Sequence, residues 1–111
     1  IEAAVRQRLA ANVEKNENGV WIIVIVRKRL IYHGRVQGVG FRYTAKRLAN
    51  VLELTGWVKN EYNGTVIMEV QGKEATIYRL MEGINRDIYI QIDWIDSKEI
   101  PVKEESCFSI K

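Results

Sequence analysis

The order of strand-like and helix-like segments constrains the fold of this chain more than any other feature of the sequence. Strands are indicated where residues alternate in polarity or are mostly β-branched or aromatic, and helices where apolar residues recur at three- and four-residue spacing. The segments run strand, helix, strand, strand, helix, strand, at residues 20–32, 41–52, 55–60, 64–72, 73–85 and 88–95. The Asn63-Gly64 pair indicates a hairpin turn between the two adjacent strands, because both residues tolerate positive φ. This order predicts a split βαβ arrangement, an α+β fold with an antiparallel sheet and two helices on one of its faces.

The two ends of the chain lie outside this series of segments. Apolar residues at four-residue spacing predict a short amphipathic helix over residues 1–18, which Gly19 would end in a left-handed conformation. A last short strand is expected near Cys107–Ile110. We therefore expect an N-terminal extension at residues 1–26, with a helix and a strand lead-in, and one folded domain at residues 27–111.

Length and composition exclude several classes of protein. The 111 residues suffice for one domain with a modest core, and 47% apolar with 28% charged residues is typical of a soluble globular chain. Cys107 is the only cysteine, so no disulfide can form within the chain and a reducing compartment is the default. The longest apolar run, Val20–Val26, is far shorter than the ~18–20 residues that cross a bilayer, and acids precede it, which argues against a signal peptide. These features predict a cytoplasmic protein.

Positive charge is concentrated in one part of the sequence. Residues 20–52 contain no Asp or Glu, whereas the rest of the chain contains all 14 acids. The cations of this segment are Arg27, Lys28, Arg29, Arg35, Arg42, Lys46 and Arg47. A region of one charge sign favours an anionic partner, and the alternative is a basic face that is merely solvated. Glycines at the centre of the region favour the anionic partner.

Three glycines, Gly34, Gly38 and Gly40, lie between the first strand and the first helix. Glycine allows positive φ and a close approach of the backbone to a ligand, so successive N–H groups here can converge on an anion. The helix that begins at Phe41 would add unpaired N–H groups and a partial positive charge. Arg42, in its first turn, can donate two hydrogen bonds to a phosphate, although a cation there is unfavourable by about 0.3–1 kcal/mol. The pattern predicts a phosphate-binding loop, and a merely tight turn is the alternative.

Three segments together resemble the acylphosphatase family: "GRVQGVGFR" at 34–42, "GWVKN" at 56–60 and "GTVIMEVQG" at 64–72. The eighteen-residue spacing from Arg42 to Asn60 also fits that family, and the resemblance extends over Arg29–Ile110. It implies a ferredoxin-like βαββαβ sandwich, in agreement with the order of segments above. It also implies hydrolysis of the carboxyl–phosphate bond of an acyl phosphate to a carboxylate and inorganic phosphate.

The resemblance also implies roles for individual residues. Arg42 would bind the phosphoryl oxygens, and Asn60 would hold the attacking water. The backbone N–H groups of the loop would complete the phosphate cradle, at Arg35, Val36, Gln37, Gly38, Val39 and Gly40. The family needs no metal or other cofactor and forms no phosphoenzyme, so a small-molecule acyl phosphate is the expected partner. General chemistry agrees, since phosphoryl transfer requires mainly positioning and charge stabilisation.

Other functions fit parts of the pattern. A similar domain stands at the N-terminus of the large carbamoyltransferases that mature hydrogenases, and we expect a stand-alone enzyme because no linker is evident near the end of the chain. RNA-recognition modules share the order of strands and helices, but they stack bases on aromatic residues of central strands, which residues 64–71 lack. A non-catalytic phosphate-binding relative would be expected to lack Arg42 or Asn60. We therefore expect a monomer without a nucleic-acid or membrane partner.

A few residues depart from the family pattern or border the loop. Glu53 stands where the family has a glycine, and a left-handed conformation there would cost about 1–2 kcal/mol. His33 is interpreted as an ordinary strand residue because it has no evident partner, and Cys107 as an inert core thiol. The tryptophans are interpreted as packing residues: Trp21, Trp57 and Trp94.

Overall fold

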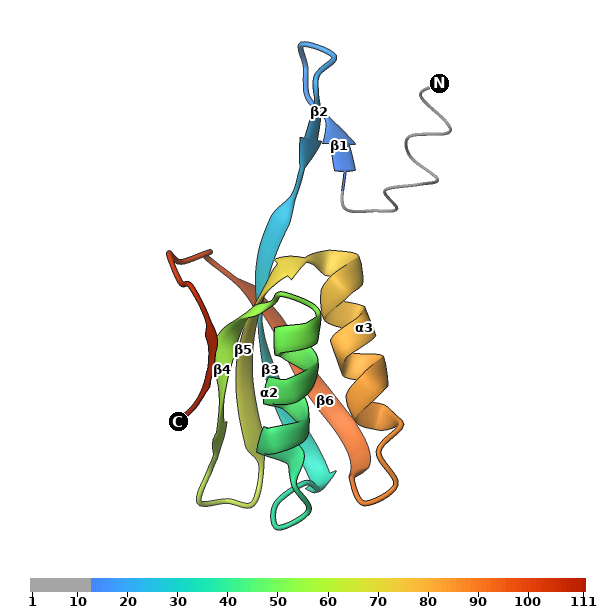
Figure 1. Ribbon diagram of the computed structural model, residues 1–111, viewed down its shortest axis with the longest axis vertical. Helices are drawn as coiled ribbons and strands as arrows, with labels where there is room; N and C mark the ends of the chain where they lie inside the picture. Colours follow the sequence, from blue (N-terminus) through green and yellow to red (C-terminus); the bar gives the residue numbers. More distant parts are fainter. Residues whose placement is uncertain (1–12) are drawn as a thin grey trace.

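A computed structural model describes residues 13–111 of the chain (Figure 1). Its elements, in chain order, are β1 (Val13–Lys15), β2 (Trp21–Ile23), β3 (Ile25–Arg35), α2 (Phe41–Val51), β4 (Thr55–Asn60), β5 (Val66–Lys73), α3 (Glu74–Asn85), β6 (Gln91–Ile100) and β7 (Phe108–Ile110). None of the helices in this part of the chain is long and apolar enough to span a membrane.

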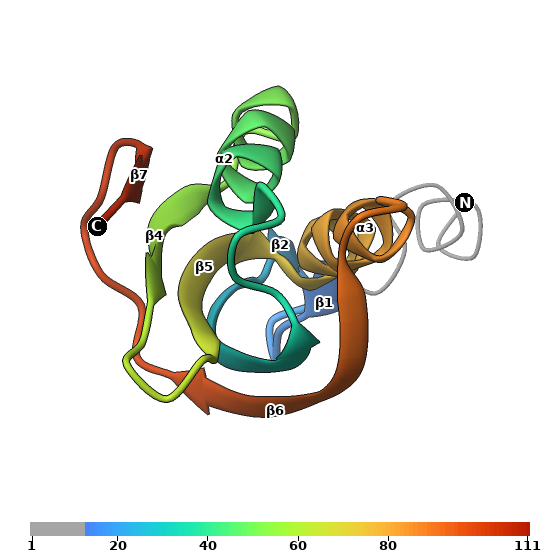
Figure 2. The same cartoon turned by 90° about the horizontal axis from the view of Figure 1, so that it is seen from below.

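Five strands form one sheet in the order β6-β3-β5-β4-β7, and α2 and α3 both cover one of its faces (Figures 1 and 2). Neighbouring strands are antiparallel except β7, which pairs in parallel with β4. This confirms the predicted α+β, ferredoxin-like arrangement, although β7 makes the sheet mixed rather than wholly antiparallel. The difference arises because residues 101–107 carry the chain from β6 to the opposite edge of the sheet, where β7 enters in the direction of β4.

The core lies between the sheet and the two helices. Tyr32 of β3 and Met68 of β5 are fully buried. The predicted apolar face of α2 is confirmed, since Phe41, Ala45 and Ala49 are buried. The ring of Tyr32 packs edge-on against Phe41 with 4.8 Å between centroids, so β3 contacts the first turn of α2 directly. The buried residues of α3 are Ile77, Leu80 and Ile84.

The C-terminus of α2 confirms the expectation for Glu53. Glu53 has φ 58° and is the one residue other than glycine with a positive φ among residues 13–111. The N–H of Leu54 donates to the carbonyl of Ala49 (2.9 Å) and the N–H of Glu53 donates to that of Asn50 (3.2 Å), which together form a Schellman motif. The motif requires a left-handed residue at the position of Glu53, so the side chain at this position is strained.

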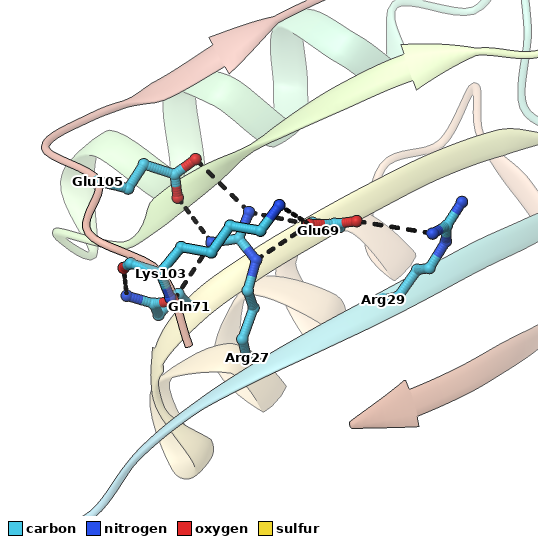
Figure 3. Close-up of polar contacts among 6 residues, drawn as sticks. All are labelled: Arg27, Arg29, Glu69, Gln71, Lys103 and Glu105. Atoms are coloured by element: carbon cyan, nitrogen blue, oxygen red, sulfur yellow. Dashed lines mark hydrogen bonds and ion pairs between the residues drawn. The ribbon is translucent and has the colours of Figure 1, made fainter. Parts of the chain in front are cut away.

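A polar network on the open face of the sheet holds the connection from β6 to β7 in place (Figure 3). Arg27, with 0% exposure, donates to Glu69 of β5 (3.0 Å) and to Glu105 of the connection (2.8 Å). The side chain of Gln71 donates to the carbonyl of Lys103 (2.7 Å) and accepts from its N–H (2.9 Å). Burial alone would lower the pKa of Arg27, but the hydrogen bonds and charges of Glu105 and Glu69 outweigh it and raise that pKa. The network therefore fixes the approach of β7 to β4, the strand that ends at Asn60.

The structure contradicts part of the expectation for the N-terminal segment. Val13–Lys15 form β1, which pairs antiparallel with β2, rather than the end of a helix. The side chain of Asn16 accepts hydrogen bonds from the N–H groups of Asn18 (3.0 Å) and Val20 (2.9 Å), and Gly19 has φ 76°, so these residues form a hairpin turn. The rest of the predicted helix, residues 1–12, lies outside the described residues. Figure 1 shows this hairpin at the end of the domain opposite the glycine loop.

The strand predicted at Ile88–Ile95 begins later, at Gln91, and contains a bulge. His33 lies opposite Trp94 while Gly34 lies opposite Ile92, so β6 has one extra residue at this point. Trp94 is therefore on the open face with 56% of its surface exposed, so it packs against a neighbouring ring at the surface and not in the core. It stacks on His33 at 4.3 Å, and His33 also contacts the carboxylate of Asp96 at 2.8 Å. The prediction that His33 has no partner is wrong for the same reason, since the bulge alters which side chains meet.

Two smaller expectations also change. Cys107 is exposed rather than a core thiol, because β7 begins one residue later and Phe108 occupies the buried position. The turn between β4 and β5 has five residues, 61–65, and Gly64 alone takes a positive φ of 88°. Asn63 instead accepts hydrogen bonds from the N–H and hydroxyl groups of Thr65 (3.1 and 2.6 Å), which shapes the turn without a left-handed asparagine.

Candidate active site

The glycine loop, residues 36–40, connects β3 to α2 at the end of the domain that also carries the β4–β5 turn (Figures 1 and 2). Val36 anchors the loop, since its side chain is buried in the core. Gly38 and Gly40 have φ values of 72° and 80°, which side chains with a Cβ rarely adopt. The glycines therefore allow a bent backbone directly before the helix begins.

Backbone N–H groups of the loop and of the first turn of α2 have no hydrogen-bond acceptor in the described part of the chain, from Gln37 through Tyr43. The first helical bond runs from the N–H of Thr44 to the carbonyl of Gly40, at 3.0 Å. No side chain caps the helix, and its first turn contains no acid. A helix N-terminus with unpaired N–H groups is a binding site for anions, and here the loop extends the run of donors.

A pocket of about 150 Å³ lies against this run of donors and brings Arg42 together with Asn60. Its lining residues are Val36, Gly38, Gly40, Phe41, Arg42, Tyr43 and Asn60. We call it the phosphate pocket. Arg42 is half-buried and forms no hydrogen bond or ion pair with any of residues 13–111. An unpaired guanidinium beside unpaired N–H groups makes the pocket strongly attractive to an anion.

Asn60, the last residue of β4, closes the other side of the phosphate pocket. Its Oδ1 is buried and has no hydrogen-bond partner in the described residues. Leaving a buried acceptor unpaired costs about 1–3 kcal/mol, so a bound molecule that donates to this amide would be stabilised. A water molecule can both donate to Oδ1 and accept from Nδ2 of a carboxamide that rotates about its last torsion.

Gln37 has a role that the sequence did not indicate. Its Nε2 donates to the carbonyl oxygens of Glu61 (2.7 Å) and Thr65 (2.9 Å), which are the two ends of the β4–β5 turn. Only the backbone of Gln37 was predicted to act, in the phosphate cradle. The side chain fixes the loop against the turn that follows Asn60, so it sets the distance between the two sides of the phosphate pocket. A glutamine in a loop gives no sequence signal for such a long-range contact.

The remaining predicted residues lie on the other side of the loop. Arg35 and Val39 line a second pocket of about 400 Å³, whose other lining residues are Gly38, Ile88, Tyr89 and Gln91. Arg35 is the last residue of β3 and lies opposite Gln91 of β6. The phosphate pocket thus brings together five of the predicted residues: Val36, Gly38, Gly40, Arg42 and Asn60. Arg35 and Val39 line the neighbouring pocket, and Gly38 lines both pockets. Among residues 13–111, no three His, Cys, Asp or Glu side chains are arranged to hold a metal ion.

Known proteins are similar in sequence to this chain over the residues that form the site. The family model described as Acylphosphatase matches residues 28–110, which include every residue that lines the two pockets. An acylphosphatase from Clostridium beijerinckii is 43% identical over 89 residues, which cover 78% of this chain and 99% of that protein.

Solved structures agree with the sequence comparison. The crystal structure of acylphosphatase from Bacillus subtilis matches with a TM-score of 0.73 and 33% identity, covering 78% of this chain and 98% of that one. Full-length HypF, solved in a phosphate- and nucleotide-bound form, matches with a TM-score of 0.70 and 30% identity over 79% of this chain and 12% of HypF. The near-complete matches to acylphosphatases favour hydrolysis of acyl phosphates over the carbamoyltransferase alternative. The chain belongs to the acylphosphatase family.

Proposed function

We propose that the phosphate pocket holds the phosphoryl group of an acyl phosphate while water cleaves its carboxyl–phosphate bond. The observation that carries this proposal is the unbroken run of unpaired N–H groups at residues 37–43 beside the unpaired Arg42. The phosphoryl oxygens accept hydrogen bonds from this run, and the guanidinium of Arg42 donates to them from the first turn of α2. These donors are in position before the reaction, so they stabilise the negative charge of the transition state without reorganisation.

Asn60 positions the nucleophile in this proposal. Its carboxamide lines the same pocket as Arg42 and the loop, so a water bound to it lies next to the phosphoryl group. The water oxygen forms the new bond to phosphorus while the bond from phosphorus to the carboxylate oxygen breaks, giving a carboxylate, inorganic phosphate and a proton. A carboxylate is a good leaving group, and phosphoryl transfer depends mainly on positioning and charge stabilisation. A neutral amide that orients water is therefore sufficient, and no strong base is needed.

The rest of the proposal concerns where and with what the enzyme acts. We propose a cytoplasmic monomer that needs no metal or cofactor and has no nucleic-acid or membrane partner. The single cysteine supports the cytoplasmic part of this proposal, since no disulfide can form within the chain.

Hydrolysis of benzoyl phosphate, followed by its absorbance in the presence of EDTA, tests the proposal. Arg42→Ala is expected to lower kcat/KM by about 10²–10³ and to weaken inhibition by inorganic phosphate, because it removes a donor to the phosphoryl oxygens. Asn60→Ala is expected to lower kcat by a similar factor of about 10²–10³ while phosphate still inhibits, because it removes only the water-binding amide.

Two exposed residues of α2 serve as matched controls. Arg47→Ala removes one cation from the same helix, and Asn50→Ala removes one exposed carboxamide. Neither residue lines the phosphate pocket, so both variants are expected to keep the wild-type kcat within about twofold. Wild-type protein that binds phosphate without turning over benzoyl phosphate would contradict the proposed hydrolysis. Equal losses in Arg42→Ala and Arg47→Ala would contradict the role of Arg42.

A further inference from the structure

The polar groups of the phosphate pocket suit the phosphoryl group of the substrate rather than its acyl group. Unpaired N–H groups, Arg42 and Asn60 line this pocket of about 150 Å³. With the phosphoryl group and the attacking water bound there, the acyl group of the substrate extends toward a neighbouring surface. Which neighbouring surface receives that group decides the substrates that the enzyme prefers.

The second pocket, of about 400 Å³, is in the right place to receive the acyl group. Gly38 lines both pockets, and a Cβ built on Gly38 would meet no atom within 4 Å. The space over this glycine is therefore open, and a substrate can extend from one pocket into the other. We call the second pocket the acyl pocket.

Two apolar residues that line the acyl pocket belong to a turn that is hydrogen-bonded to α2. Ile88 and Tyr89 are 87% and 69% exposed, although they belong to a short turn that is tightly hydrogen-bonded. The N–H of Tyr89 donates to a carboxylate oxygen of Asp87 (2.8 Å), and the N–H of the buried Ile90 donates to the carbonyl of Asp87 (3.3 Å). The other carboxylate oxygen of Asp87 accepts from the hydroxyl of Thr44 (3.4 Å), two residues beyond Arg42 on α2. These hydrogen bonds connect the turn that carries Ile88 and Tyr89 to α2, the helix of Arg42.

The acyl pocket is also lined by an unpaired positive charge. Arg35 is exposed and forms no ion pair or side-chain hydrogen bond within residues 13–111. Elsewhere on β3 the arginines have acidic partners, as Arg27 and Arg29 do with Glu69. Gln91, which lies opposite Arg35, adds a neutral carboxamide. A pocket lined by both apolar side chains and a free guanidinium fits an acyl chain that ends in an anionic group.

We propose that the acyl pocket binds the acyl group of the substrate and selects a short chain with a second, distal carboxylate that pairs with Arg35. This inference rests on the proposed function, since it assumes that the phosphoryl group occupies the phosphate pocket. The methylene groups of the chain contact Ile88 and Tyr89, and the distal carboxylate accepts hydrogen bonds from Arg35.

Three substrates separate the apolar and ionic contributions. Acetyl, butyryl and succinyl phosphate share the reacting bond; butyryl adds methylene groups to acetyl, and succinyl replaces the terminal methyl of butyryl by a carboxylate. The measured quantities are the butyryl-to-acetyl and succinyl-to-butyryl ratios of kcat/KM, which do not depend on the fraction of folded enzyme. Tyr89→Ala is expected to lower the first ratio by about threefold or more, because a buried methylene contributes roughly a fourfold preference. Arg35→Gln is expected to lower the second ratio by about fivefold, the value of an exposed ion pair.

Each of the two variants has a matched control on the surface of the protein. Tyr62→Ala removes a fully exposed tyrosine and Arg47→Gln an exposed arginine; neither residue lines the acyl pocket, so neither variant is expected to change its ratio. Unchanged ratios in Tyr89→Ala and Arg35→Gln, or equal changes in the controls, would overturn the assignment of the acyl pocket. If Tyr89→Ala changes the butyryl-to-acetyl ratio but Arg35→Gln leaves the succinyl-to-butyryl ratio unchanged, the selection of a second carboxylate would be overturned. Failure of the wild type to hydrolyse all three compounds would instead overturn the proposed function.

Discussion

Replacing Glu53 by glycine is expected to stabilise this protein. Glu53 occupies the left-handed position of the Schellman motif that ends α2, with φ 58°. Its side chain is exposed and makes no hydrogen bond or ion pair with any residue in the described part of the chain. The substitution therefore removes backbone strain and sacrifices no contact of the folded state.

The size of the effect follows from two opposing contributions. A left-handed conformation costs a residue with a Cβ about 1–2 kcal/mol, and glycine avoids this cost. Glycine also gains freedom in the unfolded chain, which lowers the free energy of unfolding by about 0.4–1 kcal/mol. The net gain is about 1 kcal/mol, which corresponds to a rise in Tm of roughly 4–8 °C for a domain of this size.

Urea unfolding followed by circular dichroism measures this gain, and Glu53→Ala is its control. Alanine removes the carboxylate but keeps the Cβ, so it is expected to leave the free energy of unfolding within about 0.5 kcal/mol of wild type. If glycine and alanine stabilise the protein equally, the gain comes from the loss of charge and the strain argument is refuted. A glycine variant no more stable than wild type would refute it as well.

Three further predictions concern buried or bridging polar groups. Tyr32→Phe is expected to raise the free energy of unfolding by about 1 kcal/mol, because the buried hydroxyl of Tyr32 has no partner among residues 13–111. Burial also raises the pKa of Tyr32 above its ordinary 10.0, so the folded state holds the phenol proton more tightly than the unfolded chain does. The free energy of unfolding of the wild type should therefore fall as the pH rises above 10, because the unfolded chain then loses this proton first. Urea unfolding at about pH 7 and about pH 11 should show a smaller fall in this free energy for Tyr32→Phe. Gln37→Glu keeps the size of the side chain but cannot donate to the β4–β5 turn, and kcat measured with benzoyl phosphate should fall by about tenfold or more. Arg27→Met leaves Glu69 buried without its main partner, and urea unfolding should show a loss of about 3–5 kcal/mol.

Each of these predictions has a result that would contradict it. A less stable Tyr32→Phe would mean that the hydroxyl has a stabilising partner. A Gln37→Glu enzyme with the wild-type kcat would show that the loop holds its position without the bridge. For Arg27, the double variant Arg27→Met with Glu69→Leu should recover most of the lost stability; no recovery would mean that the cavity, and not the unpaired charge, causes the loss.

The parts of the fold that could be predicted depend on local patterns. The apolar face of α2 and the order of strands and helices along the chain follow from the spacing of residues close in sequence. This spacing determines whether a segment favours a helix or a strand before any tertiary contact forms. These features are confirmed because each is determined within a few residues of the chain. The left-handed backbone at Glu53 is expected only through the resemblance, because Glu53 stands where the acylphosphatase family has a glycine.

The wrong predictions concern pairings between distant residues. The extra residue of β6 turns Trp94 to the open face and gives His33 a partner, and nothing in the alternation of Ile88–Ile95 indicates it. Cys107 became exposed because β7 starts one residue later than expected. A shift of a single residue in a strand moves every side chain to the other face, so small errors of register change the whole burial pattern.

The candidate site combines both kinds of information. The glycines and Arg42 lie within one loop and one helical turn, so the sequence indicates an anion site from local geometry and from a cation placed against the helix dipole. Asn60 is eighteen residues further on, and the sequence indicates its role only through resemblance. In the fold, β4 ends beside the loop, and Gln37 ties the loop to the turn after Asn60. Arg42, Oδ1 of Asn60 and the unpaired N–H groups of Gly38, Gly40 and the first turn of α2 border the same pocket, which is the arrangement expected where a ligand and not the protein completes the hydrogen bonding.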